Sequence, residues 1–480
     1  MSRNRQGRNA AWGVLLALVS VTLFTHAERK PPPRTEGKEG QARQWGSFDT
    51  PFAADSPWNS RPVDPVFSDA TVPAAKYAPA IESGKWSTGV FHALPGKGGP
   101  VTVHGPPDKP GLWRADDRTF ENIVLPRWPE GVKPASGSDG HAEIVDTATG
   151  IVHSFWKLRV EQGKWIADQY AWTSLGGSGW GDPAHTIQGA RAAGVSAIGG
   201  LIRTQEVGDN QALYRHALSM SLPTTALAPA PTYVYPATSA DKEAKAVNTG
   251  RIPEGALLML PAAFDTATID DARIRKIAET LKVYGAYVVD RNGSTGFVIY
   301  SEIDSGLELH GRVWNAQAVA DLEKIRVALR QVTGARQWVD GDGKVVQREP
   351  RANLLSMRGP WTTAAGHAKA SFDSWSQSLV LEGASGGAVV TKTFADDVTE
   401  VSWAKPAPGD RYRIECRATG GATCRLQMRK ADAGDNVVDS GDLADKETAQ
   451  FAWPAGKVSV SLTARASSPS ATVRMLLTRQ

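Results

Sequence analysis

Residues 141–158 read HAEIVDTATGIVHSFWKL, two alternating runs joined by a turn. Successive strand residues point to opposite faces, so this stretch predicts a β-hairpin with DTATG as its turn. If Asp146 lies opposite Ile151, then the same register sets Glu143 opposite Ser154. The segment therefore predicts a β-rich fold and fixes which side chains share a face.

The two faces of this hairpin differ in chemistry. Ala142, Ile144 and Phe155 form an apolar face that should meet the core, and His153 falls on that side as a structural histidine. The opposite face carries His141, Glu143, Ser154 and Trp156. An indole stacks on a sugar ring, and His or Glu can transfer a proton, so this face is typical of a sugar cleft. An ordinary solvated sheet face is the alternative.

The turn before the hairpin, SGSDG at 136–140, places Asp139 beside His141. Asp139 could orient the imidazole or stabilise its charge. Ser-Asp-Gly is also common turn chemistry, and both interpretations stay open.

Outside the hairpin, composition also favours a folded, loop-rich β protein. The chain has 480 residues with 41% hydrophobic content, 16 Trp, 47 Gly and 30 Pro, which suggests two or three domains rich in turns. The net charge of +4 is small, and its densest basic part lies in the first eight residues. A nucleic-acid partner is therefore not expected.

The N-terminus predicts export. Residues 1–27 join a basic start to an apolar run and a small residue at the end, which is typical of a signal peptide. An uncleaved anchor is the alternative, although the run is short for a spanning helix. Residues 28–44 are polar and predict a flexible linker. We expect a secreted or periplasmic protein without a membrane span in the mature chain.

The rest of the chain predicts a mainly β fold with a few helices. Residues 45–340 are expected to form the main, catalytic domain as a β-sandwich or jelly-roll-like fold, followed by a connector at 341–370. Residues 371–480 predict eight short strands, a C-terminal β-sandwich of a carbohydrate-binding kind.

Three helices are expected in the main domain. The clearest covers Ile269 to Tyr284, capped by Gly285, with a hairpin over residues 286–302 after it. A second covers Ala316 to Val332. A third lies in Gln188 to Ala197 or within Asn210 to Met220.

The two cysteines, Cys416 and Cys424, lie eight residues apart in this strand-rich tail. In an oxidising compartment they are expected to form a disulfide across a hairpin. A zinc site needs further ligands, and no His follows His367. No metal site and no cofactor are predicted, although a structural calcium site would leave no trace in the sequence.

Further candidates are spread along the main domain. Trp180 lies in a glycine-rich loop suited to a cleft rim. This loop lacks the residue pattern of a phosphate-binding loop. Tyr233 and Tyr235 alternate on one strand. With Arg203 and His216 they supply residue types that a uronate lyase needs: a group that neutralises the carboxylate, a base and an acid. A hydrolase instead needs two carboxylates, for which Glu143, Asp182, Asp290 and Glu302 are available.

Four segments resemble a group of secreted bacterial proteins common in actinobacteria. They are GSDGHAEIVD at 137–146, GGLIRTQEV at 199–207 with His216-Ala217-Leu218 after it, YVYPAT at 233–238 and LKVYGAYVVD at 281–290. The resemblance covers about residues 56–302, including the opening SPWN, and implies that these segments form one domain. It assigns no activity and no catalytic residue.

These observations favour a secreted enzyme that degrades an extracellular polysaccharide, with lyase slightly ahead of glycoside hydrolase. His141 is the leading proton-transfer candidate, with Asp139 and Glu143 beside it, Arg203 as an anion contact and Tyr235 as an acid. Trp156, Trp180, His216 and Tyr233 are the expected substrate contacts. The alternative is a non-catalytic cell-surface or matrix protein that binds glycans.

Overall fold

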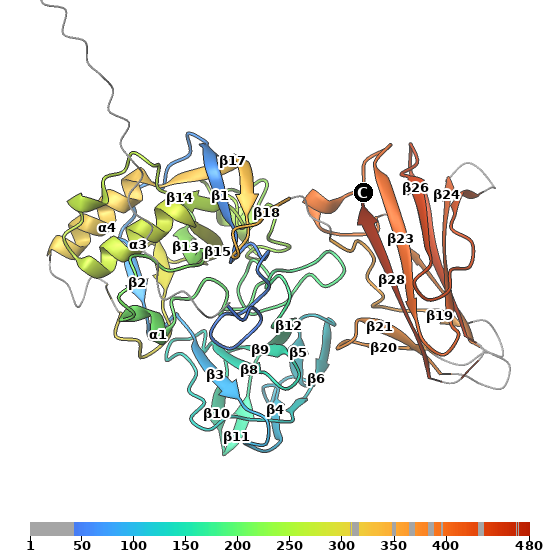
Figure 1. Cartoon of the computed structure of the whole chain (residues 1–480). Coiled ribbons are helices and arrows are strands. Elements are labelled where there is room, and N and C mark those ends of the chain that lie inside the picture. The colour runs from blue at the N-terminus through green and yellow to red at the C-terminus, as the bar shows by residue number, and fades with distance from the viewer. Residues whose placement is uncertain are drawn as a thin grey trace, which may run out of the picture. The chain divides into compact units, whose positions relative to one another are not determined.

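A computed structural model describes most of the chain from residue 43 onward. It covers residues 43–307, 309, 316–347, 352–363, 370–382, 388–394, 397–430, 436–466, 468 and 470–480. The predicted signal peptide and nearly all of the predicted linker lie outside these residues. Residues 44–480 form one compact unit. The expected mainly β class with a few helices is confirmed (Figure 1), and no helix in the described part is long and apolar enough to cross a membrane.

The largest sheet collects strands from both ends of the main region. Its spatial order is β1 (Arg61–Phe67), β17 (Arg330–Val339), β14 (Leu257–Met259), β15 (Ala286–Asn292), β13 (Leu218–Pro223), β16 (Val298–Tyr300) and β2 (Ala80–Glu82), with β18 (Val345–Val346) paired to β17. β13 runs parallel to β15 and antiparallel to β16. The hairpin expected at 286–302 is therefore wrong, because the fully buried strand β13 inserts between its two halves.

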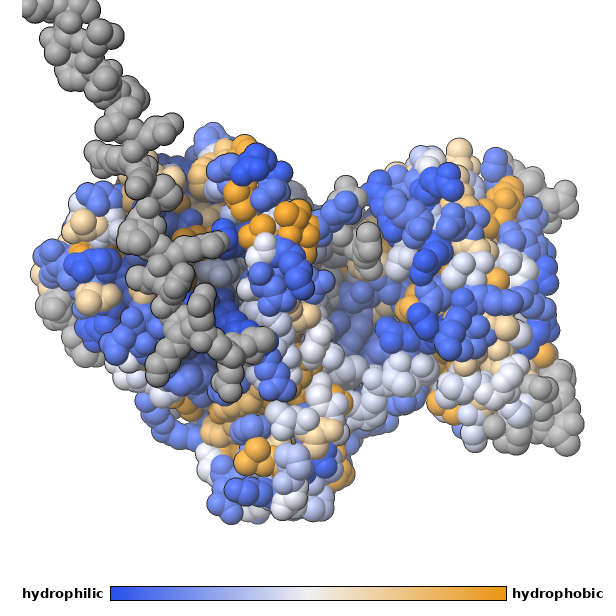
Figure 2. All heavy atoms as spheres, viewed as in Figure 1, coloured by the Kyte–Doolittle hydropathy of each residue, from blue (hydrophilic) through white to orange (hydrophobic). Residues whose placement is uncertain are grey.

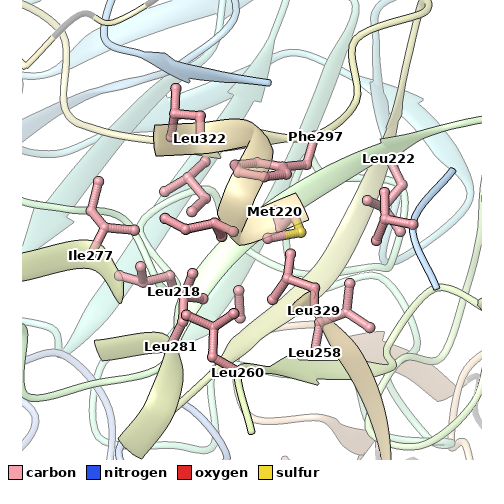
Figure 3. Packing of buried hydrophobic residues seen from close by; sticks show 14 of the residues in the cluster. Leu218, Met220, Leu222, Leu258, Leu260, Ile277, Leu281, Phe297, Leu322 and Leu329 are labelled. Atoms are coloured by element: carbon pink, nitrogen blue, oxygen red, sulfur yellow. The ribbon is translucent and has the colours of Figure 1, made fainter. Parts of the chain in front are cut away.

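Two helices cover one face of this sheet. Helix α3 (Ala272–Val283) begins at Asp271, whose carboxylate accepts hydrogen bonds from the backbone of Arg273 and Ile274, and it ends before Gly285, where φ is +76°. Helix α4 (Ala316–Ala328) packs beside it. The buried residues between helices and sheet include Ile277, Leu281 and Leu322 from the helices and Leu218, Met220 and Leu222 from β13 (Figure 3).

The other helix predictions need correction. The second helix stops at Ala328, since residues from Arg330 continue as strand β17 with β-branched and aromatic residues. Neither Gln188 to Ala197 nor Asn210 to Met220 is helical; the first is turns and loop, and the second leads into β13. The remaining helices are single turns: α1 (Thr204–Val207), α2 (Ala244–Val247), η1 (Thr266–Thr268) and η2 (Ser402–Ala404).

Two smaller sheets complete the main region. One has the order β3 (Gly89–Ala93), β8 (Ala142–Asp146), β9 (Ile151–Trp156), β12 (Gln169–Ser174), β5 (Leu112–Arg114) and β6 (Thr119–Glu121). The other has the order β10 (Arg159–Glu161), β11 (Lys164–Ile166), β4 (Val101–His104) and β7 (Ile123–Leu125). Phe155, Ile144 and Leu112 lie in the core that these sheets share.

The expected C-terminal β-sandwich is present as two five-stranded sheets. One has the order β19 (Thr362–Thr363), β22 (Ala388–Phe394), β27 (Val458–Ala466), β24 (Thr423–Lys430) and β25 (Asn436–Asp439). The second has the order β20 (Ala370–Asp373), β21 (Ser378–Leu381), β28 (Ala471–Arg479), β23 (Arg411–Ala418) and β26 (Thr448–Ala452). Seven of the eight expected strands are present. The eighth was expected at residues 399–403, where the structure has a bend followed by the start of η2.

The cysteines lie on strands of opposite sheets, Cys416 on β23 and Cys424 on β24. Both are buried free thiols. The expected hairpin between them is wrong, because β23 and β24 belong to different sheets. A disulfide between them stays a prediction, and it would join the two sheets.

The face of the molecule in Figure 2 is mostly hydrophilic, with small separate apolar patches. Among the described residues, exposed aromatic side chains include Trp86 at 43%, Phe120 at 46% and Trp375 at 40%. Trp86 lies next to a cluster of charged groups, because its backbone oxygen accepts a hydrogen bond from Arg191.

Candidate functional site

The predicted hairpin exists as strands β8 and β9 with the predicted register. Asp146 pairs with Ile151, and Glu143 pairs with Ser154. The polar face, however, is not open to solvent: Glu143 is 0% and His141 is 2% exposed. The loop around Ser196 covers this face, so the expectation that it lines a cleft is wrong for these two side chains.

Glu143 ties that covering loop to the sheet. Its carboxylate accepts hydrogen bonds from Ser154 Oγ at 2.6 Å, from Ser196 Oγ at 2.7 Å and from the backbone N–H of Ala197 at 2.9 Å. Burial raises the pKa of Glu143 to about 7, although these hydrogen bonds oppose the rise. Glu143 therefore acts as a buried structural tie.

His141 is also enclosed. Burial lowers its pKa well below the usual value, and the positive charge of Arg191 lowers it further. Its Nδ1 is buried and has no hydrogen-bond partner among the described residues. A neutral, enclosed imidazole is not positioned to exchange protons with a polysaccharide.

Arg191 is the centre of the polar cluster beside His141. Its side chain is 3% exposed, and its Nη1 lies 3.3 Å from Asp290 Oδ2. Its Nη2 donates to the carbonyl oxygen of Trp86 at 3.2 Å. Its Cζ lies 4.0 Å from the centre of the Tyr300 ring, a cation–π geometry. These contacts hold the guanidinium in one position.

A bulge in β15 brings Asp290 to this cluster. Met220 pairs with Val288 and Ser221 pairs with Asp290, so Val289 has no partner across β13. Without the bulge, alternation would point Asp290 with Val288 into the core beneath the helices. With it, Asp290 lies on the opposite face, where Arg191 and Tyr300 are.

Two further carboxylates lie within electrostatic range of Asp290. Burial raises the pKa of Asp290 to about 6; Arg191 lowers it, while the charges of Asp241 and Asp139 raise it. The side chains of Asp290 and Asp241 are each 21% exposed, and Asp139 is half-buried. At least two carboxylates in this cluster therefore keep partial contact with solvent.

Two indoles lie next to these carboxylates. Trp156 Nε1 donates to Asp139 Oδ1 at 3.3 Å, and the Lys157 ammonium lies 4.2 Å from the centre of the Trp156 ring. The Trp86 ring lies against Gly137: a Cβ at Gly137 would meet a Trp86 ring carbon at 3.0 Å and the Lys85 carbonyl at 2.3 Å. Gly137 thus lets Trp86 approach the turn that carries Asp139.

We call this set of residues the Arg191 cluster. It consists of Trp86, Asp139, Trp156, Lys157, Arg191, Asp241, Glu254, Asp290, Arg291 and Tyr300.

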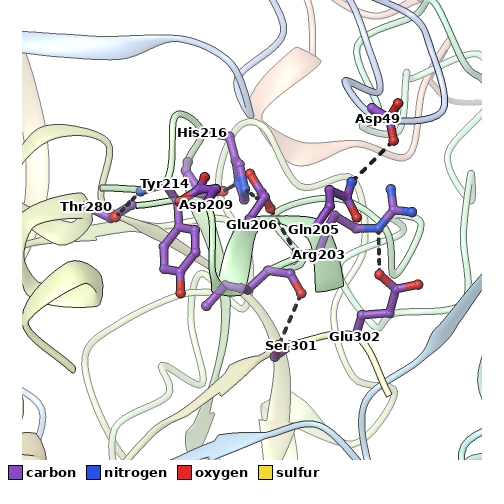
Figure 4. Close-up of polar contacts among 12 residues, drawn as sticks. Asp49, Arg203, Gln205, Glu206, Asp209, Tyr214, His216, Thr280, Ser301 and Glu302 are labelled. Atoms are coloured by element: carbon purple, nitrogen blue, oxygen red, sulfur yellow. Dashed lines mark hydrogen bonds and ion pairs between the residues drawn. The ribbon is translucent and has the colours of Figure 1, made fainter. Parts of the chain in front are cut away.

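Arg203 and His216 belong to a different group (Figure 4). Arg203 Nε lies 3.0 Å from Glu302 Oε2, and its backbone N–H donates to Glu206 Oε2 at 2.9 Å. His216 Nε2 lies 3.2 Å from the same Glu206 oxygen. Arg203 also stacks on the Phe48 ring. These contacts satisfy the charges locally, which is the pattern of a structural network.

Tyr235 and Trp180 form a third group, and the Tyr233 hydroxyl accepts a hydrogen bond from the backbone N–H of Ser402 at 3.2 Å. Trp180 and Tyr235 line a pocket of about 420 Å³ together with Trp403. The Tyr235 ring contacts Trp403 edge-on at 5.0 Å, and Trp403 Nε1 donates to the carbonyl oxygen of Ala237 at 2.6 Å. Trp180 is 1% exposed and stacks on Trp58 at 4.6 Å, so it is mainly a core residue.

Sequence reasoning identified Asp139 and Trp156 of the Arg191 cluster and named Asp290 only as one available carboxylate. It did not identify Arg191, Asp241 or Trp86. Arg191 and Asp241 lie in loops without periodicity, where no local pattern marks a site. Within the described residues, no group of three or more His, Cys, Asp or Glu side chains has the geometry of a metal site.

No protein-family model matches this chain, and no curated protein matches it. Partial similarities exist to solved structures. A glycosylation-associated protein complex from Streptococcus agalactiae matches with 14% identity and a TM-score of 0.19, over 25% of this chain and 41% of that one. A xylan-binding domain from Paenibacillus barcinonensis matches with 13% identity and a TM-score of 0.18, over 26% of this chain and 90% of that domain.

An arabinoxylan arabinofuranohydrolase from Bacillus subtilis matches with 12% identity and a TM-score of 0.14, over 34% of this chain and 37% of that one. The chain thus spans less than half of the Streptococcus agalactiae and Bacillus subtilis proteins. Because all of these similarities are partial, we infer the function from the geometry of the site itself.

Proposed function

We propose that this protein is a secreted carbohydrate-active enzyme that hydrolyses an extracellular polysaccharide at the Arg191 cluster. One observation carries this proposal: the Asp290 carboxylate is held 3.3 Å from the buried Arg191 guanidinium while its side chain stays 21% exposed. Burial raises its pKa to about 6, and the charges of Asp241 and Asp139 contribute to the rise. Half-buried Trp156 donates a hydrogen bond to Asp139, and exposed Trp86 lies against Gly137, two residues before Asp139. Glycoside hydrolysis needs a protonated carboxyl group, an ionised carboxylate and a surface on which a sugar ring can stack.

In this proposal Asp290 donates the proton to the leaving glycosidic oxygen. A pKa of about 6 keeps part of the carboxyl population protonated near neutral pH. Asp139 is the second carboxylate, which stabilises positive charge at the sugar or activates a water molecule. Arg191 positions Asp290 through its 3.3 Å ion pair. Trp86 and Trp156 supply stacking surfaces.

The residue types alone favour a lyase in which His141, Arg203 and Tyr235 act together. These side chains are held by separate partners: His141 lies near Arg191, Arg203 pairs with Glu302, and Tyr235 contacts Trp403. The 2% exposure of His141 also speaks against a role as base. The geometry therefore supports hydrolysis better than elimination.

A non-catalytic glycan-binding role is the second candidate, and the aromatic surface of Trp86 and Trp156 favours it equally. It differs from the first in needing no proton donor. Secretion, or residence in the periplasm, is part of both proposals and follows from the predicted signal peptide. The resemblance to secreted actinobacterial proteins is compatible with both.

The test is to incubate the purified protein with neutral, acidic and amino-bearing polysaccharides. Release of reducing ends without absorbance of unsaturated uronate supports hydrolysis. Unsaturated product would instead establish a lyase. Retention on a polysaccharide without any product would leave only the binding role.

A further inference from the structure

A pocket of about 570 Å³ adjoins the Arg191 cluster, beside the turn that carries Asp139. This volume lies within the range of pockets that hold small ligands. The pocket shares Lys157 with the cluster, so a polymer bound at one of them has the other within reach. The polar and backbone groups that line it come from Ser136, Ser138, Gly140, Lys157, Arg159 and Asp168.

Backbone hydrogen bonds hold this turn against the end of strand β9. The N–H groups of Lys157 and Leu158 donate to the carbonyl oxygens of Asp139 and Gly140, at 2.7 Å and 3.0 Å. The two lining serines of the turn are exposed. The wall of the pocket is therefore preformed, and it offers two hydroxyl groups to a ligand.

The charges around Arg159 balance one another within the chain. Asp168 accepts hydrogen bonds from Lys109 Nζ at 3.1 Å and from Arg159 Nη1 at 2.9 Å. Arg159 Nε also donates to Glu161 at 2.5 Å. Two cations and two carboxylates thus alternate along this series of contacts, which presents no net charge to the pocket.

Lys157 is different, because its ammonium has no carboxylate partner among the described residues. Its half-buried side chain places Nζ 4.2 Å from the centre of the Trp156 ring, a cation–π contact that holds the ammonium in place. The carboxylate of the turn, Asp139, accepts instead from Trp156 Nε1 at 3.3 Å. A positioned ammonium without a counter-ion at the edge of a pocket attracts an anionic group of a ligand.

We propose that this pocket binds an acidic sugar residue of the polysaccharide, whose carboxylate or sulfate group pairs with Lys157 while its hydroxyl groups contact the serines of the turn. This inference rests on the proposed function, because it names the substrate class of the same site. It assigns the anion contact to Lys157 in place of Arg203, whose guanidinium is engaged by Glu302.

Lys157→Gly is the sharpest variant for the test. The backbone at Lys157 has φ of +55°, a left-handed conformation that favours glycine, so the change removes the ammonium without straining the backbone. Lys446→Gly is the matched control, since Lys446 is an exposed lysine of the C-terminal sandwich with φ of +67°. Lys157→Gln keeps the packing on Trp156 and gives the same readout if the glycine loosens the turn.

Calorimetric titration of the purified chain compares oligogalacturonate, a sulfated neutral oligosaccharide and the same oligosaccharide without sulfate, all of equal length. At least one acidic ligand should bind about tenfold more tightly than the neutral one, and the one that does so identifies the anion as carboxylate or sulfate. High salt should reduce this preference. Lys157→Gly should abolish it, whereas Lys157→Arg and Lys446→Gly should retain it.

The outcomes separate this inference from the proposed function. Equal affinity for acidic and neutral ligands, or an undiminished preference in both Lys157→Gly and Lys157→Gln, would overturn the inference. Hydrolysis of neutral glycans with no acidic preference would do so and leave the hydrolase proposal intact. An acidic preference that depends on Lys157, without product from any glycan, would support the pocket and overturn the hydrolase proposal.

Discussion

The guanidinium of Arg191 lies over the ring of Tyr300, 4.0 Å from its centre. This stacking fixes Arg191 so that it can pair with Asp290 while its other nitrogen is bound to a backbone carbonyl oxygen. A fixed cation lowers the pKa of its neighbouring carboxyl group, and here it offsets part of the rise caused by burial. Burial, the fixed charge of Arg191 and the neighbouring carboxylates Asp241 and Asp139 thus set the pKa of Asp290 together.

Asp290→Asn should abolish hydrolysis and leave the fold intact. The change keeps the shape of the side chain and removes the transferable proton. We expect turnover to fall by at least about 100-fold, the usual contribution of a general acid, without a loss of melting temperature. The matched control is Asp304→Asn, which alters an exposed acid paired with Lys133. An Asp290→Asn enzyme with full activity would exclude Asp290 as the proton donor.

The pH profile should report the proton on Asp290. With a pKa of about 6 the donor loses its proton as pH rises, so kcat/KM should fall above about pH 6. Arg191→Gln removes a charge that lowers this pKa, so the fall should move to higher pH. A merely structural role for Arg191 would lower activity at every pH without moving the profile.

Glu143 should make the protein more stable at acidic pH. Its folded-state pKa of about 7 exceeds the usual 4.5, so the folded protein binds this proton more tightly than the unfolded chain does. The contribution is present in full below about pH 4.5 and is lost as pH rises through 7, by about 3 kcal/mol. Urea unfolding at several pH values should show a smaller slope for Glu143→Gln. Identical slopes for the two proteins would contradict the assignment.

Trp86→Ala should weaken glycan binding. The residue is 43% exposed, so its truncation removes an exposed stacking surface together with the buried part that packs against Gly137, and melting temperature should fall as well. We expect the dissociation constant to rise about tenfold, a loss of about 1.4 kcal/mol. Phe120→Ala is the matched control, since Phe120 is 46% exposed on β6. Unchanged affinity in Trp86→Ala would remove Trp86 from the site.

Phe155→Ala and His141→Ala should both destabilise the protein. Phe155 is 0% exposed within an aromatic core, and its truncation should cost about 3 kcal/mol or more in unfolding free energy. His141 is 2% exposed, so its truncation also leaves a cavity. Thermal unfolding of both variants checks this, and an unaffected His141→Ala would restore the exposed-face interpretation.

Local sequence patterns correctly predicted those structural features that depend on residues close together in the chain. The register of Glu143 against Ser154 follows from alternation and turn length, and α3 follows from helical spacing that ends at Gly285, although it begins three residues later than the expected Ile269. Alternation does not state what covers a sheet face. The loop around Ser196 supplies that cover from a distance in sequence, so Glu143 and its neighbour His141 became buried.

The order of strands in the largest sheet also could not be predicted from local sequence patterns. Residues 286–302 contain a turn that favours a hairpin, yet β13 lies between its two strands because its apolar side chains fill the core under the helices. Asp290 illustrates the same limit: strict alternation places it in the core, and only pairing with β13 produces the bulge that turns it outward.

That bulge makes the chemistry of the site depend on the relative length of two paired strands. Inserting one residue between Met220 and Ser221 would give Val289 a partner, and strict alternation would then turn the Asp290 side chain to the helix side. Deleting Val289 would also restore a continuous ladder, yet Asp290 would then follow Val288 directly and would keep its place opposite Ser221 on the Arg191 face. A one-residue difference in β13 between related chains therefore separates sequences with an acid at this site from sequences without one.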